Sequence, residues 1–238
     1  MAHLRLLTFG GLTLLLGGDA TTGATTRRRR LALLALLAVA RARGLQRDKI
    51  HAYLWPESDA ARARHGLNQL LYFQRSHLDG GDLFVGKKTL RLNRDAIAID
   101  VWEFEDALDA GAYEDAVRLY TGPFLDGFFL RNAPEFERWA EEQRKRLAKR
   151  CAEALGALAA RATARGDGRD AVAWWRRATE LDPFNSDTVV RLIEACVATG
   201  DRVAAVRYAQ DHAELLRAEL GLTPDPRVSG MVERLKAG

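Results

Sequence analysis

Three segments in the second half of the sequence share the pattern Gly-x-x-x-x-Ala-Val, and this repeat limits the possible folds more than any other feature. The segments are Gly111–Val117, Gly166–Val172 and Gly200–Val206. The second and third copies begin 34 residues apart, which is the period of a tetratricopeptide helix pair. Small alanines let two helices approach closely, and each glycine suits the turn between them. The pattern therefore predicts stacked helix pairs.

The position of the first copy predicts one further helix in this region. This copy begins 55 residues before the second, so we expect an additional helix over Glu135–Arg161. Pro183 is expected to end the helix of one repeat. Stacked helix pairs form concave surfaces that suit protein partners. Two other roles remain open for them, which are dimerisation of the protein and support of its first half.

The first half of the sequence is organised differently, with short apolar segments separated by glycines. Leu4–Phe9 and Leu12–Leu16 have the length and the flanking residues of strands in a small antiparallel sheet. A helix is predicted after them, because apolar residues then recur at the three-and-four spacing of one buried face. The residues at this spacing are Leu31, Leu34, Leu37 and Ala38.

Two further helices and a hairpin are predicted before residue 98. Arg47–Pro56 gives a short helix that ends at its proline, and a third helix is expected from Ser58 or Asp59 to Leu78. Leu83–Leu92 has apolar strands on both sides of a basic tip, which is typical of a hairpin. A sheet, three helices and a hairpin follow one another in this order in winged helix-turn-helix domains. The predicted fold class is therefore mainly α with small antiparallel β elements, an N-terminal winged helix-turn-helix followed by a tetratricopeptide-like helical domain.

Four consecutive arginines, Arg27 to Arg30, precede the apolar run Leu31–Ala40. The run has ten residues, whereas a membrane-spanning helix needs about 20. A signal peptide carries its charges at the start of the chain and ends in a small-residue cleavage site, but here Arg41 and Arg43 close the run. We expect a cytoplasmic protein that does not contact membranes. The first predicted helix begins at these arginines, although its macrodipole disfavours positive charge there.

The charge of the chain is divided unevenly between its halves. Residues 1–99 contain sixteen basic and seven acidic residues, a balance of +9, and residues 100–238 contain twenty basic and 25 acidic residues, a balance of −5. Such an asymmetry is typical of a basic module for a polyanion joined to a module with another role. An arginine-rich composition that happens to be unevenly shared would give the same numbers.

The third predicted helix carries the candidate DNA-binding residues, because it would lie in the major groove. Its apolar face consists of Ala63, Leu67, Leu70, Leu71 and Leu78. The candidates on its other faces are Arg62, His65, Asn68, Gln69, Tyr72, Phe73, Arg75 and Ser76. Asparagine and glutamine can pair with adenine, arginine with guanine, and aromatic rings can meet thymine methyl groups. Simple solvent exposure remains the alternative for His65.

Four basic residues outside this helix complete the predicted interface. Lys87 and Lys88 lie at the tip of the hairpin and would approach the DNA backbone or the minor groove. Arg27 and Arg28 are candidates for phosphate contacts, since helix stability does not explain them. A solvated basic flank is an equally good explanation for either arginine, and lysines are common at surface turns.

The segment "RDKIHAYLWPESDAARARHGLNQLLYFQRSHL" resembles the winged helix of bacterial transcriptional activators of the antibiotic-regulator type. Three later segments, "GPFLDGFFLRNAPEFERWAEEQRKRL", "ELDPFNSDTVVRLIEA" and "ELGLTPDP", resemble the companion bacterial transcriptional activator domain. The resemblance implies a DNA-binding domain over 1–98 and a helical activator domain over 99–238. It also implies an activator that binds double-stranded promoter DNA, as a homodimer or as paired copies on direct repeats, and that contacts RNA polymerase.

The third helix departs from the family pattern near its end. Where the family commonly has "LYRLRRAL", this chain reads "LYFQRSHL". Phe73 and Ser76 occupy positions that are usually basic, and fewer cations weaken the phosphate contribution to affinity. An exposed Phe73 could contact a thymine or another protein. A second hypothesis follows, in which the chain is a non-enzymatic interaction scaffold that has lost specific DNA recognition.

The sequence contains none of the common motifs of an enzyme or a cofactor site. It has no P-loop, no glycine-rich dinucleotide fingerprint, no H-E-x-x-H and no spaced Cys/His cluster. We therefore predict a protein that is not an enzyme and that holds no cofactor or metal. Cys151 and Cys196 lie in apolar helical contexts and are expected to be buried structural thiols. Asp211–Glu214 places carboxylates beside a histidine and is expected to be solvated surface.

Overall fold

The computed structural model describes residues 4–16, 19–20, 25–76 and 82–237, without the side chains of residues 16, 19–20, 25–27 and 73–76. The chain forms two compact units. Unit 1 consists of Met1–Ala110 and Arg118–Lys145, and unit 2 consists of Gly111–Val117 and Arg146–Gly238. These units are defined by packing, so the division into functional domains at residue 98 stays a prediction. No helix in the described part of the chain is both long enough and apolar enough to span a bilayer.

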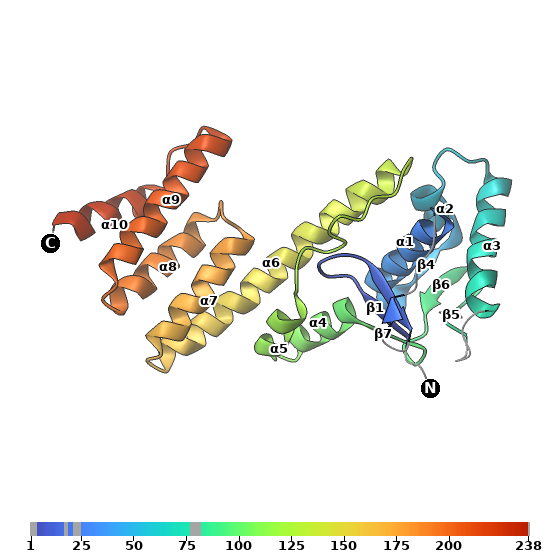
Figure 1. Cartoon of the computed structure of the whole chain (residues 1–238), viewed down its shortest axis with the longest axis horizontal. Coiled ribbons are helices and arrows are strands. Elements are labelled where there is room, and N and C mark those ends of the chain that lie inside the picture. The colour runs from blue at the N-terminus through green and yellow to red at the C-terminus, as the bar shows by residue number, and fades with distance from the viewer. Residues whose placement is uncertain (1–3, 17–18, 21–24, 77–81, 238) are drawn as a thin grey trace. The chain divides into compact units, whose positions relative to one another are not determined.

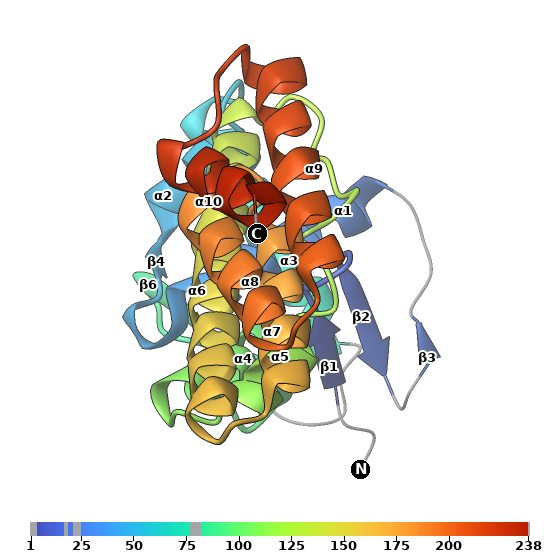
Figure 2. The same ribbon diagram turned by 90° about the vertical axis from the view of Figure 1, so that its left-hand side faces the viewer.

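Unit 1 begins with a four-stranded sheet in the order β3-β2-β1-β7. Its strands are β1 (Leu4–Leu7), β2 (Thr13–Leu16), β3 (Asp19–Ala20) and β7 (Ile97–Ile99). The antiparallel pairing of the two strands predicted near the N-terminus is confirmed by β1 and β2, with Leu4 opposite Leu16, and β3 forms a further antiparallel pair with β2 (Figure 2). β7, in contrast, runs parallel to β1 and places Ile97 opposite Leu4. The sequence did not predict this pairing, because a strand of three residues contains nothing that indicates which distant strand it pairs with.

The first helix, α1 (Thr25–Ala40), is buried on every side rather than on one face. All residues from Ala32 to Ala38 are buried, because α1 packs against α2, α4 and the strands β4 and β6. The predicted helix and its buried face are confirmed at Leu34, Leu37 and Ala38, and the burial extends beyond the predicted face to the residues between them. A short 3-10 turn, Arg41–Arg43, follows the helix.

The winged helix-turn-helix is completed by two helices and a second sheet. The elements are β4 (Leu45–Gln46), α2 (Arg47–Leu54), α3 (Ala60–Ser76), β5 (Phe84–Val85) and β6 (Thr89–Leu92). The strands form a sheet in the order β4-β6-β5, so β5 and β6 are the predicted hairpin, and we call this hairpin the wing. In Figure 1, α3 is the outermost helix of unit 1. The predicted end of α3 at Leu78 lies outside the described residues.

The helix α4 (Asp100–Asp109) is attached to the first sheet by a buried carboxylate. Asp100 accepts hydrogen bonds from the backbone N–H of Thr8 at 2.7 Å, from its hydroxyl at 2.6 Å, and from the N–H of Phe9 at 3.0 Å. Its Oδ1 also accepts from the N–H of Val101 at 2.7 Å, which gives a partner to one of the backbone donors in the first turn of α4. Two more helices follow, α5 (Tyr113–Leu119) and α6 (Pro134–Ala164), and α6 confirms the predicted additional helix.

Unit 2 contains the helices α7 (Gly168–Leu181), α8 (Ser186–Ala198), α9 (Arg202–Leu220) and α10 (Pro226–Ala237). α8 packs between α7 and α9, and α10 covers α8 and α9 (Figure 2). The repeat explains this stacking. Its glycines, Gly111, Gly166 and Gly200, have φ values of 71°, 78° and 81°, the left-handed conformation that ends helices. Its alanines, Ala116, Ala171 and Ala205, are buried, so the predicted tetratricopeptide-like pairs are confirmed.

Two sequence expectations about buried groups in unit 2 have opposite outcomes. Cys151 and Cys196 are buried free thiols, as predicted. His212 is also buried, so the prediction of a solvated surface over Asp211–Glu214 is wrong at this residue. Its two ring nitrogens lie 3.0 Å from the Ser186 hydroxyl and 3.0 Å from the Pro183 carbonyl, and hydrogen bonds at both ends allow the ring to be buried.

Candidate nucleic-acid interface

The face of α3 that is opposite its leucines is open to solvent. Ala63, Leu67 and Leu70 are buried, as the sequence predicts. The candidate residues Arg62, His65, Asn68, Gln69 and Tyr72 are all exposed, and Tyr72 retains 75% of its accessible surface. The side chains of the candidates Phe73, Arg75 and Ser76 lie outside the description. α3 therefore presents polar groups and one large aromatic ring on a single exposed face.

α3 is held in place by a close approach of its backbone to Trp55. A Cβ atom added to Gly66 would lie 2.9 Å from Cζ2 of the Trp55 ring, a distance too short for a carbon–carbon contact. Arg29 lies over the same indole at 5.9 Å and donates a hydrogen bond from Nε to the carbonyl of Leu54 at 3.1 Å. Gly66, Trp55 and Arg29 thus connect α3, the end of α2 and the start of α1.

The wing carries Lys87 and Lys88 at an exposed tip, as predicted. Gly86 shapes this tip, because its φ is 98° and an added Cβ would lie 2.0 Å from the carbonyl oxygen of Thr89. Within the described part of the chain, neither lysine forms an ion pair that would compete with a phosphate. Both charges are therefore available to a polyanion.

Arg47, the first residue of α2, joins the wing to α3, and the sequence did not single it out. Its Nε donates to the carbonyl of Lys87 at 2.7 Å and its Nη1 donates to Oδ1 of Asn68 at 3.1 Å. Its backbone N–H also donates to the carbonyl of Lys88 at 3.3 Å. The sequence did contain one indication that Arg47 has such a role, because a cation at a helix N-terminus is unfavourable unless it has another partner.

A second side-chain pair lies along α3 itself. The amide nitrogen of Gln69 and Nε2 of His65 are 2.9 Å apart, one helical turn from each other. Because both side chains are exposed, this pair holds the amide of Gln69 at the surface of α3. His65 therefore has a partner in the described structure in addition to its exposure to solvent.

The arginines before the apolar run have partners within unit 1. Arg28 donates to the carbonyl of Phe129 at 2.8 Å, and its guanidinium lies 5.6 Å from the ring centre of Phe128. The side chain of Arg27 is not described. The contacts of Arg28 and Arg29 give both residues a structural role that the sequence analysis did not assign. Phosphate contacts by Arg27 and Arg28 stay predictions.

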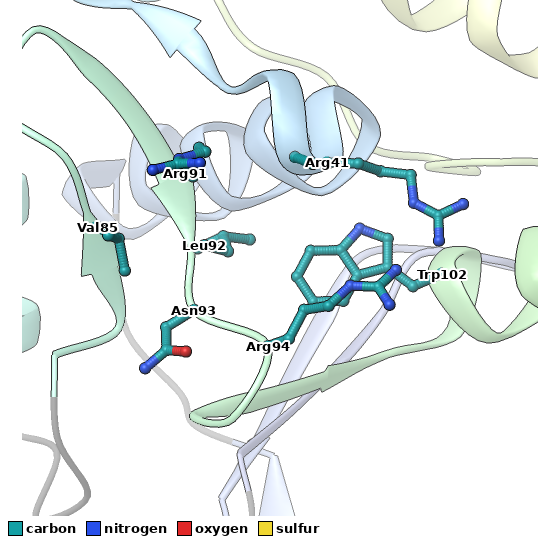
Figure 3. A pocket seen from close by; sticks show the side chains of 8 residues that line it. Arg41, Val85, Arg91, Leu92, Asn93, Arg94 and Trp102 are labelled. Atoms are coloured by element: carbon teal, nitrogen blue, oxygen red, sulfur yellow. The ribbon is translucent and has the colours of Figure 1, made fainter.

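A cavity of about 290 Å³ lies behind the wing and is lined by eight residues. Figure 3 shows Arg41 and Arg94 extending toward the side of Trp102, whereas Arg91 points away from it. Arg41 pairs with Glu105 and Asp106, and Arg94 also pairs with Asp106 at 3.3 Å. The two arginines beside the indole are thus neutralised by α4, and both of them meet at the Asp106 carboxylate.

The described residues contain no group of three or more His, Cys, Asp or Glu side chains placed to hold a metal ion. The two candidate thiols also lack the features of reactive cysteines. Burial raises the pKa of Cys151 to about 12, and the nearby Arg177 opposes this effect only weakly. Burial likewise raises the pKa of Cys196. Both thiols therefore remain protonated at neutral pH, which fits structural positions.

Comparisons with known proteins agree with this architecture. The structure resembles that of Mycobacterium tuberculosis EmbR, solved in complex with a low affinity phosphopeptide, with a TM-score of 0.68 and 22% sequence identity. The match covers 100% of this chain and 66% of the EmbR chain, so this chain spans just under two thirds of the length of that relative. No curated protein matches the sequence.

A family model provides the assignment. The model described as "Bacterial transcriptional activator domain" matches residues 87–236, which include the tip of the wing, β7 and all of the helices from α4 to α9. This range is more than half of the chain, and the EmbR fold extends over the remaining residues of unit 1. The chain belongs to the bacterial transcriptional activator domain family.

Proposed function

We propose that this protein is a transcriptional activator that binds promoter DNA through its winged helix. The observation that carries the proposal is the exposed polar face of α3, which stands beside a wing whose two lysines are available. Both elements lie in the half of the chain with a charge balance of +9. A protein of this family with such a surface has the parts that sequence-specific DNA binding needs.

The dimensions of α3 suit the major groove. Its 17 residues extend over about 25 Å at 1.5 Å per residue, and B-DNA accepts one helix in its major groove. Arg62, Gln69 and Tyr72 would then face base edges. Lys87 and Lys88 would contact phosphates or the minor groove, which contributes affinity without selecting a sequence. Arg27 and Arg28 would contact the DNA backbone. Arg28 can do so only if it breaks its hydrogen bond to the carbonyl of Phe129.

Unit 2 is proposed to supply the contacts with other proteins. Its stacked helix pairs provide an extended surface, and its fifteen basic and fifteen acidic residues balance, so no net positive charge draws this unit to DNA. We propose that this surface contacts RNA polymerase or a second copy of the chain, bound as a homodimer or on direct repeats. The protein would then act in the cytoplasm, where bacterial promoters lie.

The proposal is tested by titrating the full-length protein against a labelled random duplex at about 50 and 200 mM salt. Neutralising several phosphates makes affinity fall steeply with salt, so we expect at least a tenfold loss between these concentrations. The same protein is then used to select duplexes from a random pool, and we expect enrichment of one motif. Absence of binding at the lower salt concentration would contradict the proposal and favour an interaction scaffold without DNA recognition.

A further inference from the structure

Arg47 lies between the wing and α3. Its guanidinium reaches two elements at once, the wing through the carbonyl of Lys87 at 2.7 Å and α3 through Oδ1 of Asn68 at 3.1 Å. Its own backbone N–H adds a third bond, to the carbonyl of Lys88 at 3.3 Å. Since Arg47 begins α2, these bonds hold the wing tip and α3 against one helix end.

The chemistry of this bond fixes the orientation of the Asn68 amide. A guanidinium has only donors, so the Asn68 atom that faces it must be the carbonyl oxygen. The amide nitrogen, with two N–H donors, therefore lies on the other side of the exposed side chain. Asn68 can donate hydrogen bonds to a ligand in this arrangement, whereas Arg47 occupies one lone pair of its oxygen and holds that oxygen toward the guanidinium.

This orientation decides which base suits Asn68. An asparagine that reads adenine uses its oxygen to accept from N6 and its nitrogen to donate to N7, so it needs both groups. Guanine presents only acceptors, O6 and N7, in the major groove, whereas cytosine presents a donor. A side chain that offers two N–H groups while its oxygen is held elsewhere therefore matches guanine best, because thymine presents one acceptor, O4, beside its methyl group, and adenine and cytosine present donors.

We infer that Arg47 is a positioning residue that sets Asn68 to read guanine and fixes the wing beside it. The inference rests on the proposed DNA-binding function and specifies its base preference at one position. It replaces the pairing with adenine that an asparagine at this place would otherwise suggest. Arg47 itself contributes to selectivity through Asn68, not through a base contact of its own.

Selection from a random duplex pool by the full-length protein and three variants tests this inference. Comparison of the wild type with Asn68→Ala identifies the base pair that depends on Asn68, and we expect guanine there with about a tenfold preference. Arg47→Lys keeps the charge but replaces the guanidinium fork, whose Nε and Nη1 reach Lys87 and Asn68 separately, with a single nitrogen. The Asn68 oxygen is then no longer held by the fork and can turn toward a base, so Arg47→Lys is expected to admit adenine at that position.

Asn68→Asp is the matched control, because it keeps the shape and the bond to Arg47 but replaces the donor with an acceptor. It should lose guanine and favour cytosine, whose N4 amino group donates. All variants should retain the salt-sensitive binding of random duplex, and their melting temperatures should stay close to the wild type. If the proteins bind DNA but the wild type selects adenine at that position, or Arg47→Lys still selects guanine there, the inference is overturned and the proposed function stays intact. A wild type that binds no duplex would overturn both.

Discussion

At the scale of single residues, the position of α3 depends on Gly66. The indole of Trp55 occupies the space that a side chain at this position would need, since an added Cβ would lie 2.9 Å from the ring. Glycine normally weakens a helix by about 1 kcal/mol relative to alanine, so its presence in the middle of α3 needs a reason. Close packing against α2 is that reason.

Gly66→Ala is therefore expected to destabilise unit 1 despite the better helix propensity of alanine. Overpacking costs about 1–3 kcal/mol and the helix gains about 1 kcal/mol, so we expect a net loss of about 1 kcal/mol. Gly230→Ala in α10 is the matched control, because its nearest neighbour would be the end of the Arg234 side chain at 3.6 Å, and it should be neutral or stabilising. Thermal unfolding followed by circular dichroism measures both. An increase in stability for Gly66→Ala would contradict this packing.

The two cysteines allow a second prediction at this scale. Because burial raises the pKa of Cys151 to about 12 and also raises that of Cys196, both thiols stay protonated and inaccessible in the folded protein at pH 8. A thiol reagent such as DTNB should react with neither in native buffer within minutes and with both in guanidinium chloride. Rapid reaction of one thiol in native buffer would show that its helix is not packed as described.

At the scale of elements, the wing and α3 form one surface because Arg47 joins them. The wing contributes charge at Lys87 and Lys88, and α3 contributes side chains with directional hydrogen bonds. These two contributions differ in how they depend on DNA sequence, since phosphate contacts are uniform and base contacts are selective. Variants in the two elements should therefore have different signatures.

The double variant Lys87→Ala/Lys88→Ala should weaken binding to all duplexes alike. Each lost phosphate contact is expected to reduce the slope of affinity against salt by up to about one unit, with base preference unchanged. Titration of a random and a selected duplex at several salt concentrations measures both quantities. Lys236→Ala, in the last turn of α10, removes a lysine from unit 2 and serves as the control. An unchanged slope in the double variant would show that the wing tip does not touch DNA.

The order of elements could be predicted from sequence, but several of their partners could not. Strand length, glycine spacing and the basic hairpin tip are local signals, and the strands, three helices and wing follow them. The burial of α1 on all sides, the parallel pairing of β7 and the burial of His212 depend on contacts with distant segments. Arg47 was missed for the same reason, because its role appears only when Lys87 and Asn68 are brought to it.

At the scale of the whole molecule, the two halves of the sequence have opposite charge character. The basic half of the sequence contains α3 and the wing, and the acidic half contains the repeat and its stacked helices. The family model covers residues 87–236, and likeness to EmbR extends the shared fold to the rest of the chain. In the proposed function, the basic half binds DNA and the acidic half binds other proteins.

The central claim is that α3 reads bases, and it is tested most directly by the base preference of Gln69→Ala in the full-length protein. Gln69 is exposed on α3, and its amide is held by His65 at 2.9 Å. Duplexes selected by the wild type are varied one base pair at a time and titrated with both proteins at one salt concentration. We expect a loss of about 1–3 kcal/mol of discrimination at a single base pair, with unchanged binding to random duplex and unchanged melting temperature. A variant that retains full wild-type discrimination at every base pair would contradict base reading by this face of α3.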